Sequence, residues 1–290
     1  MLLCVGNSPF EVNLMTQEQI ELISRLYEEG LSAAQLKQYV PYTEHTILKY
    51  LRKNGISIRS KAGYRKPFNE KYFDKIDTEK KAYFLGYMMA DGNVGIREKS
   101  QPVVRLELKR CDKYILDIFR EELDTDLEVK PSRKGCCVLR VHSSHLFNAL
   151  NEYGVCPQKT GNEIFPVDKI PLSLIRHFIR GFFDGDGWLT ITHHGKRKQC
   201  ANLGFCGNEN MLSDIRDYFE ETLGCYHIKI SLVSKGYTGF GNLIYGSKKD
   251  VKAICDYLYD EANSFLSRKK EKYDLFFHAN IERIPDQESV

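Results

Sequence analysis

Two acidic residues lie at matching places in two similar apolar segments of this 290-residue chain. Asp91 stands near the end of EKKAYFLGYMMADG at 79–92, and Asp186 near the end of LSLIRHFIRGFFDGDG at 172–187. A glycine follows each acid, where a helix commonly terminates. A carboxylate there faces the negative end of the helix dipole, at a cost of roughly 0.3 to 1 kcal/mol. The repeated placement favours a cation, and Mg²⁺ is held by one or two carboxylates with phosphate oxygens and water.

The same segments carry small residues four positions apart, Gly86 and Ala90 in the first and Gly181 and Gly185 in the second. Such a stripe permits close backbone contact, so we expect the two helices to cross and to bring the two acids together. A shared pair of acids on a two-fold axis fits two-metal hydrolysis of a phosphodiester. For a single segment, an Asp-Gly pair that only caps the helix is the alternative, and its repetition in register argues against it.

Both segments begin one copy of a duplicated unit, 68–160 and 161–280. Each copy has a helix, two strands, a helix, two strands and a helix, and then a lysine-containing turn. This order predicts an α+β fold of two pseudo-symmetric αββαββα repeats with saddle-shaped antiparallel sheets. One face of such a sheet can pack against helices while the other stays free, and a charged free face is suited to lying along a duplex.

Residues 14–58 carry a separate helical pattern, with Thr16, Ser32 and Thr43 as candidate N-caps of three helices. A helix, a turn and a polar, basic second helix form the arrangement in which the second helix enters a major groove. The pattern resembles resolvase-type helix-turn-helix modules, except that Val-Pro-Tyr at 40–42 replaces the usual glycine of the turn. A three-helix domain that only packs is the alternative.

Basic residues accompany these elements, although any single basic run is usually just a solvated face. The linker 59–67 is expected to track phosphates or to lie in the minor groove. The net charge of +3 is by itself too small to prove a nucleic-acid partner. The residues expected to contact DNA are His45, Thr46, Lys49, Arg52 and Lys53 in the third helix, Arg59, Lys61, Arg65 and Lys66 in the linker, Arg105, Glu107 and Lys109 on a free sheet face, and Lys196, Arg197 and Lys198 in a turn.

The segments FLGYMMADG at 84–92 and IRGFFDGDG at 179–187 resemble the two eponymous motifs of single-chain LAGLIDADG homing endonucleases. The resemblance covers residues 68–280. It implies metal-dependent double-strand cleavage of DNA at a long, asymmetric target, with short 3′ overhangs. It also implies Mg²⁺ or Mn²⁺ as the cofactor and, because both halves lie in one chain, a monomer as the catalytic unit.

The resemblance also implies roles for individual residues. By motif position, the residues of the metal site are Asp91, Asp186, Ala90 and Gly185. A basic residue near the end of each repeat falls on Lys159 and Lys269, which could polarise the phosphate or order the attacking water. For each of these the alternative is a surface lysine, and Arg268 or Lys270 could replace Lys269.

Some positions depart from the family pattern or stay open. The sixth motif position is Met89 in one copy and Asp184 in the other, which we expect to affect helix termination more than chemistry. The polar residue at the end of the second strand is not assigned, the candidates being Lys109 and Gly207-Asn208. His193 and His194 are expected to meet phosphate or solvent rather than a metal. Trp188 is expected to be core rather than a base-stacking platform.

Composition excludes several classes of protein. No stretch approaches the roughly 18 apolar residues of a membrane span, and the first residues lack a charged n-region. Nine cysteines without C-x-x-C spacing argue against a zinc site or a disulfide framework. We therefore expect a soluble protein of the cytoplasm, whether bacterial, phage-encoded or in an organellar matrix. The segments 1–13 and 281–290 carry no assignment.

Two other functions occur on the same fold. Some proteins of this fold resemble RNA maturases that help introns fold, and others are DNA-binding regulators that do not cleave. The presence of both acids argues against a pure regulator, since a binding protein has no need of them. Intron RNA stays open as a partner. An intein is disfavoured because nothing resembling splicing blocks flanks the repeat.

Overall fold

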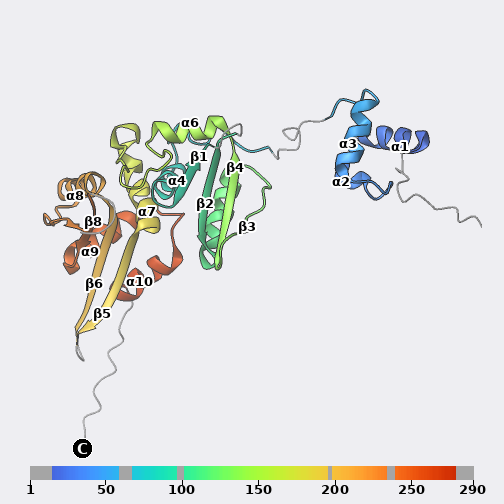
Figure 1. Ribbon diagram of the computed structural model, residues 1–290. Helices are drawn as coiled ribbons and strands as arrows, with labels where there is room; N and C mark the ends of the chain where they lie inside the picture. Colours follow the sequence, from blue (N-terminus) through green and yellow to red (C-terminus); the bar gives the residue numbers. More distant parts are fainter. Residues whose placement is uncertain (1–14, 59–66, 97–100, 195–197, 234–238, 279–290) are drawn as a thin grey trace, which may run out of the picture. The chain divides into compact units, whose positions relative to one another are not determined.

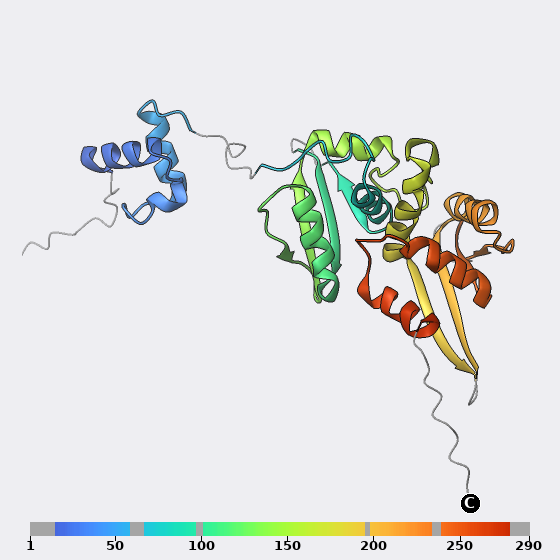
Figure 2. The same ribbon diagram turned by 180° about the vertical axis from the view of Figure 1, so that it is seen from behind.

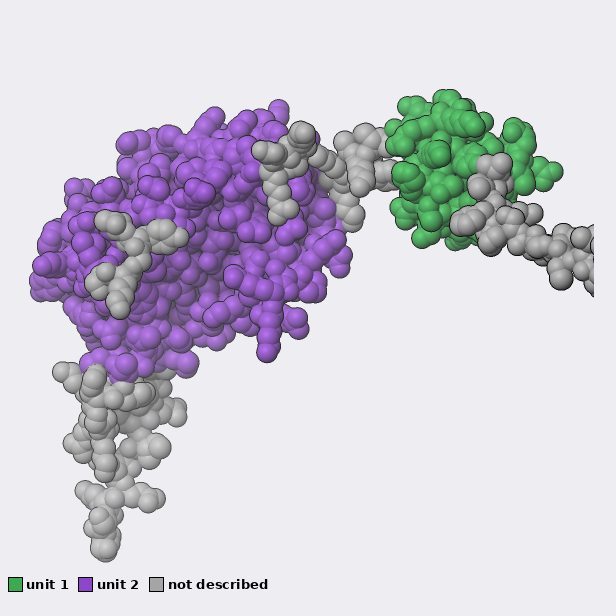
Figure 3. Space-filling model, viewed as in Figure 1, with its two compact units in different colours: residues 1–65 green, residues 66–290 purple. Residues whose placement is uncertain are grey.

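The computed structural model describes residues 15–58, 67–96, 101–194, 198–233 and 239–278. The chain divides into two compact units, residues 1–65 and 66–290 (Figure 3). Several expected DNA contacts lie outside the described residues, namely Arg59, Lys61, Arg65, Lys66, Lys196 and Arg197. The same holds for most of the expected linker and for both terminal segments.

Residues 15–58 of the smaller unit, the part that the structure describes, form the helices α1 (Gln17–Glu28), α2 (Ala33–Leu36) and α3 (Glu44–Lys53). Each begins as predicted, because the side chains of Thr16, Ser32 and Thr43 accept hydrogen bonds from backbone N–H groups of the first turns. The helix α2 is a single turn. The apolar faces enclose a core of their own, whose fully buried members are Ile23, Leu36, Ile47 and Leu51.

The first repeat of the larger unit follows the predicted order. Its elements are α4 (Glu79–Ala90), β1 (Gly92–Gly95), β2 (Val103–Lys109), α5 (Lys113–Glu122), β3 (Lys130–Pro131), β4 (Cys136–His142) and α6 (Ser144–Glu152). A short 3₁₀ turn, Arg110–Asp112, joins β2 to α5. The four strands form an antiparallel sheet in the order β1-β2-β4-β3.

The second repeat has the same order. Its elements are α7 (Ile175–Asp186), β5 (Gly187–His194), β6 (Lys198–Asn208), α8 (Glu209–Leu223), β7 (Ser231–Leu232), β8 (Phe240–Tyr245) and α9 (Lys248–Tyr259). Its sheet is antiparallel with the order β5-β6-β8-β7. The predicted α+β fold with two pseudo-symmetric repeats is confirmed. Two 3₁₀ turns, Val167–Lys169 and Leu172–Leu174, precede α7.

One prediction about the second repeat was wrong. The lysine-containing segment after its last helix was expected to be a turn, but it is the helix α10 (Ser267–Phe277). The segment begins with a run of charged residues that resembles a solvated loop, and only Lys269 and Tyr273 in it are fully buried. Its register is therefore set by contacts with β5 and α9 rather than by a strong amphipathic pattern.

The helices α4 and α7 cross between the two sheets, as Figures 1 and 2 show from both sides. A Cβ atom added to Gly86 would lie 1.9 Å from the carbonyl oxygen of Phe178, and one added to Gly181 would lie 1.9 Å from that of Tyr83. The two backbones therefore touch at both glycines, as the small-residue stripe predicted. Among the described residues, no helix is both long and apolar enough to span a membrane.

Candidate active site

The helix crossing brings Asp91 and Asp186 to one place. Asp91 is the C-terminal cap of α4, and Asp186 is the last residue of α7. A Cβ atom on Gly185 would lie 3.4 Å from Oδ2 of Asp91, so the Asp91 carboxylate lies against the end of α7. Gly92 and Gly187 follow without positive φ angles, and close packing is what requires them: an added Cβ would meet Met88 in one case and Phe183 in the other.

Asp91 is exposed and Asp186 is half-buried, but the surrounding atoms partly desolvate both carboxylates and make them harder to ionise. Desolvation raises the pKa of Asp91 and raises the pKa of Asp186 to about 7. The negative charge of Asp91 is the second cause of the raised pKa at Asp186, because the two like charges repel each other. Neither carboxylate forms a hydrogen bond or an ion pair with any described residue. Their oxygens are therefore available to a cation, which would relieve the repulsion between them.

Two lysines close the site from both repeats, and neither is a surface lysine. Lys159 is only 8% exposed, and its Nζ donates a hydrogen bond of 2.6 Å to the carbonyl oxygen of Ala90. Lys269 in α10 is 3% exposed and donates to the carbonyl oxygens of Asp184 and Gly187 at 3.0 and 2.6 Å. Each ammonium group thus binds the carboxyl end of a motif helix, where a positive charge is favoured.

Burial also shifts the titration of these ammonium groups. It lowers the pKa of Lys159, while Asp186 opposes the shift, and it lowers the pKa of Lys269 to about 8. The two residues that could have replaced Lys269 have other partners. Arg268 pairs with Asp112 at 3.2 Å, and Lys270 pairs with Asp274 at 2.6 Å.

Asp184 does not act in helix termination, contrary to the expectation. It is buried inside α7. Its Oδ2 atom accepts two hydrogen bonds, from the Tyr83 hydroxyl of α4 at 3.0 Å and from the backbone N–H of Leu266 at 2.8 Å. It therefore ties both motif helices to the start of α10, which carries Lys269. The matching Met89 is an apolar core residue, so the two halves of the site are supported differently.

The sequence did not indicate Glu163, which lies beside the site. It is buried, accepts hydrogen bonds from the backbone N–H of Gly161 and from Nδ2 of Asn208, and opposes the ionisation of Asp186. Asn208 is one of the open candidates at the end of the second strand; it also caps α8 by accepting from the N–H of Met211 at 2.9 Å. Glu163 lies in an irregular segment, so no periodic pattern could have identified it.

The expected DNA-contacting residues that the structure describes lie at the surface. In α3, His45, Lys49, Arg52 and Lys53 are exposed and Thr46 is half-buried. On β2, Arg105, Glu107 and Lys109 share the outward face as predicted, and Glu107 forms an ion pair with Arg133 at 2.6 Å. Lys198 begins β6, but its side chain lies outside the description, as do those of His193 and His194.

Trp188 is not a core residue, contrary to the expectation. The strand alternates after Gly187, so Leu189 points into the core and Trp188 points to the outward face of the second sheet, opposite Gly204. The side chain is half-buried because its indole ring packs over Gly204: a Cβ there would lie 2.3 Å from Cζ2 of the ring.

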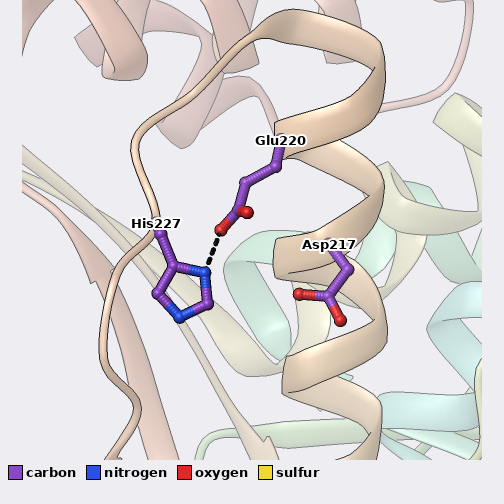
Figure 4. Close-up of side chains that lie close together, drawn as sticks. All are labelled: Asp217, Glu220 and His227. Carbon is purple, nitrogen blue, oxygen red and sulfur yellow. Dashed lines mark ion pairs between the residues drawn. The ribbon is translucent and has the colours of Figure 1, made fainter.

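A second cluster of potential metal ligands lies on the surface of α8 and the segment after it. Figure 4 shows Asp217, Glu220 and His227, with Nδ1 of His227 2.7 Å from a carboxylate oxygen of Glu220. The guanidinium group of Arg216 lies 2.7 Å from Asp217 and 3.8 Å from Glu220. Because a cation already neutralises these carboxylates, we interpret the cluster as a surface ion-pair network.

No family model matches the chain, and no curated protein matches it. Similar folds occur among solved structures. Meganuclease I-SmaMI bound to uncleavable DNA with a TTGT central four is 12% identical, with a TM-score of 0.50 over 69% of this chain and 87% of that chain. The LAGLIDADG meganuclease I-AabMI bound to uncleaved DNA is 10% identical, with a TM-score of 0.48 over 69% of this chain and 91% of that chain. At such low identity the likeness concerns the fold, and this chain has the fold of the meganuclease I-SmaMI.

Proposed function

We propose that this chain is a site-specific, double-strand DNA endonuclease of the LAGLIDADG homing type. The observation that carries the proposal is the pair of partly desolvated carboxylates without protein partners, Asp91 and Asp186, at the crossing of two helices that begin a duplicated fold. The likeness in fold to I-SmaMI, whose structure holds DNA, supports a duplex as the substrate.

Asp91 and Asp186 would hold the divalent metal ions, Mg²⁺ or Mn²⁺. The fit is good because both carboxylates lack protein partners and one raises the pKa of the other. The backbones of Ala90 and Gly185 adjoin them, although the Ala90 carbonyl oxygen already accepts a hydrogen bond from Lys159. When bound, such ions lower the pKa of water and neutralise charge on the phosphate.

Lys159 and Lys269 would each serve one scissile phosphate. Their ammonium groups are fixed by backbone carbonyl oxygens, so they need little reorganisation to stabilise negative charge on a phosphate. With a pKa of about 8, Lys269 can also exchange a proton near neutral pH. In the two-fold arrangement, one lysine would serve each DNA strand.

The DNA would lie along the outward faces of the two sheets. Arg105, Lys109 and the neighbouring basic residues of the first sheet supply positive charge there. We also propose that residues 14–58 form a helix-turn-helix module that uses the exposed face of α3, and that a monomer recognises a long, asymmetric target. Both halves of the catalytic site lie in one chain, which supports the monomer.

The first test is cleavage of a randomised duplex library with Mg²⁺. We expect defined double-strand breaks from the intact protein, and at least about 1000-fold slower cutting by Asp91→Asn and Asp186→Asn with binding retained. Asp217→Asn, in the exposed cluster, is the matched control and should cut normally. DNA or intron-RNA binding without metal-dependent cutting would instead support a regulator or a maturase.

A further inference from the structure

The two sheets can be compared residue by residue. The strand β1 begins at Gly92 opposite Leu106, and β5 begins at Gly187 opposite Phe205. Each of these strands directly follows the acid of its motif helix. The two registers therefore align the sheets, and every outward position of the first sheet has a counterpart in the second.

Charged positions on the first sheet correspond to neutral positions on the second. The aligned pairs are Arg105 and Gly204, Glu107 and Cys206, Lys109 and Asn208, Arg140 and Ile244, and Lys130 and Ser231. Apart from 193–199, whose side chains lie outside the description, the outward face of the second sheet carries no charged side chain. Its members are Trp188, Thr190, Thr192, Cys200, Asn202, Gly204, Cys206, Asn208, Ser231, Phe240, Asn242 and Ile244.

An apolar row crosses this neutral face, formed by Trp188, Gly204 and Ile244 on three adjacent strands. The missing side chain at Gly204 is what lets the indole ring lie over β6, since an added Cβ would be 2.3 Å from the ring. Ile244 is 39% exposed on the next strand. Thr190 follows Trp188 on the same face, and its methyl group extends the row.

We propose that the second sheet recognises its half of the DNA target through the methyl groups of thymines, whereas the first sheet recognises its half through guanine edges and phosphates. This inference rests on the proposed function. Thymine alone presents a C5 methyl group in the major groove, where apolar and threonine side chains contact it, whereas guanine is matched by the bidentate donors of Arg. The apolar row cannot satisfy the hydrogen-bonding edge of a G·C pair, so such pairs would be disfavoured there.

The observations favour duplex DNA over RNA as the occupant. The face starts one residue after Asp186, so whatever is cut at the candidate active site continues along it. An A-form RNA helix has a deep, narrow major groove that side chains cannot enter. The wider major groove of B-DNA admits a strand ribbon and displays the methyl groups.

Deoxyuridine provides the test because it differs from thymidine only by lacking the methyl group. The probe is the duplex selected by cleavage of the randomised library, with thymines replaced by deoxyuridines in one half at a time, and the readout is equilibrium binding without divalent metal. In the half bound by the second sheet, we expect about fourfold weaker binding for each contacted methyl group, as for burial of one methylene. Replacement in the other half should change binding less than about twofold.

Two variants at aligned positions identify which half each sheet binds. Ile244→Ala should bind the thymine duplex more weakly. The loss of affinity caused by deoxyuridine should be smaller for this variant than for the intact protein, because the substitution and the missing methyl group remove the same contact. Arg140→Ala should also weaken binding, but the loss of affinity caused by deoxyuridine should stay the same. Both positions are at the surface, and circular dichroism would confirm that the variants fold.

The inference is overturned if deoxyuridine is tolerated equally in both halves, or if deoxyuridine weakens binding of Ile244→Ala as much as it weakens binding of the intact protein. Failure of the proposed function would look different, because the intact protein would then release no cleaved product from the unmodified library and no duplex could be selected.

Discussion

Asp91 and Asp186 show how a site can oppose the folding of the chain that forms it. Both are carboxylates at helix ends, desolvation raises the pKa of each, and the charge of Asp91 further disfavours ionisation of Asp186. An acid whose pKa is raised on folding binds its proton more tightly in the folded state. The folded state is therefore favoured at low pH, and this contribution is lost as pH rises through the pKa of Asp186, about 7.

Asp186→Asn should consequently stabilise the metal-free protein above pH 7. We expect the free energy of unfolding at pH 8 to rise by roughly 2 to 4 kcal/mol, and by less at pH 5, where part of the wild-type penalty is absent. Urea unfolding in the presence of a chelator at the two pH values measures the difference. Asp217→Asn is the control on an exposed acid. An equal gain at both pH values would contradict the assigned titration.

The helices α4 and α7 position the two acids through contact between their backbones. At Gly86 and Gly181, the facing carbonyl oxygen is only 1.9 Å from where a Cβ would stand. No rotamer change can make room, since the obstructing atoms belong to a helix backbone rather than to a flexible side chain. The separation of the two carboxylates therefore depends on Gly86 and Gly181, which precede the acids in the motif helices.

Gly181→Ala should lower the free energy of unfolding by about 2 to 4 kcal/mol, because the helices must move apart inside a packed core. Cutting should fall further than binding, since the acids would separate while the sheet faces remain. Denaturant unfolding and single-turnover cleavage test the two parts. Gly95→Ala, where an added Cβ meets nothing within 4 Å, is the matched control and should be nearly neutral.

At the scale of the whole molecule, two separate cores share one chain. The helices α1 to α3 enclose one core, and the two repeats enclose the other. Each core is complete without the other, so each unit should unfold independently. If both units bind DNA, the smaller one adds affinity by tethering, without altering the site where cutting occurs.

Deletion of residues 1–66 should therefore leave the unfolding midpoint of the larger unit unchanged. Binding of the selected duplex should weaken about 100-fold, as expected for loss of one of two linked contacts. Cutting at saturating protein should keep its rate. Calorimetry and binding titrations measure these quantities, and the five basic or polar residues of α3, substituted by Ala in the full chain, provide the folded control. Equal affinity of the truncated protein would show that the smaller unit only packs.

The sequence alone determined the features that depend on local, periodic signals. Residues close together in the sequence determine these features. They are the duplication, the helix caps at Thr16, Ser32 and Thr43, the alternation of β2 and the small-residue stripe of the motif helices. The two acids could be identified for the same reason, because their placement is repeated in two copies.

The tertiary structure decided what depends on contacts between distant residues. Glu163 meets Asn208 across 45 positions, and Asp184 binds the backbone N–H of Leu266 across 82. The burial of Lys159 and Lys269, the helix around Lys269 and the outward position of Trp188 likewise follow from packing against other elements. The difference between the two sheet faces emerges only when the strand registers are known, since a shift of one residue would exchange the two faces of a strand.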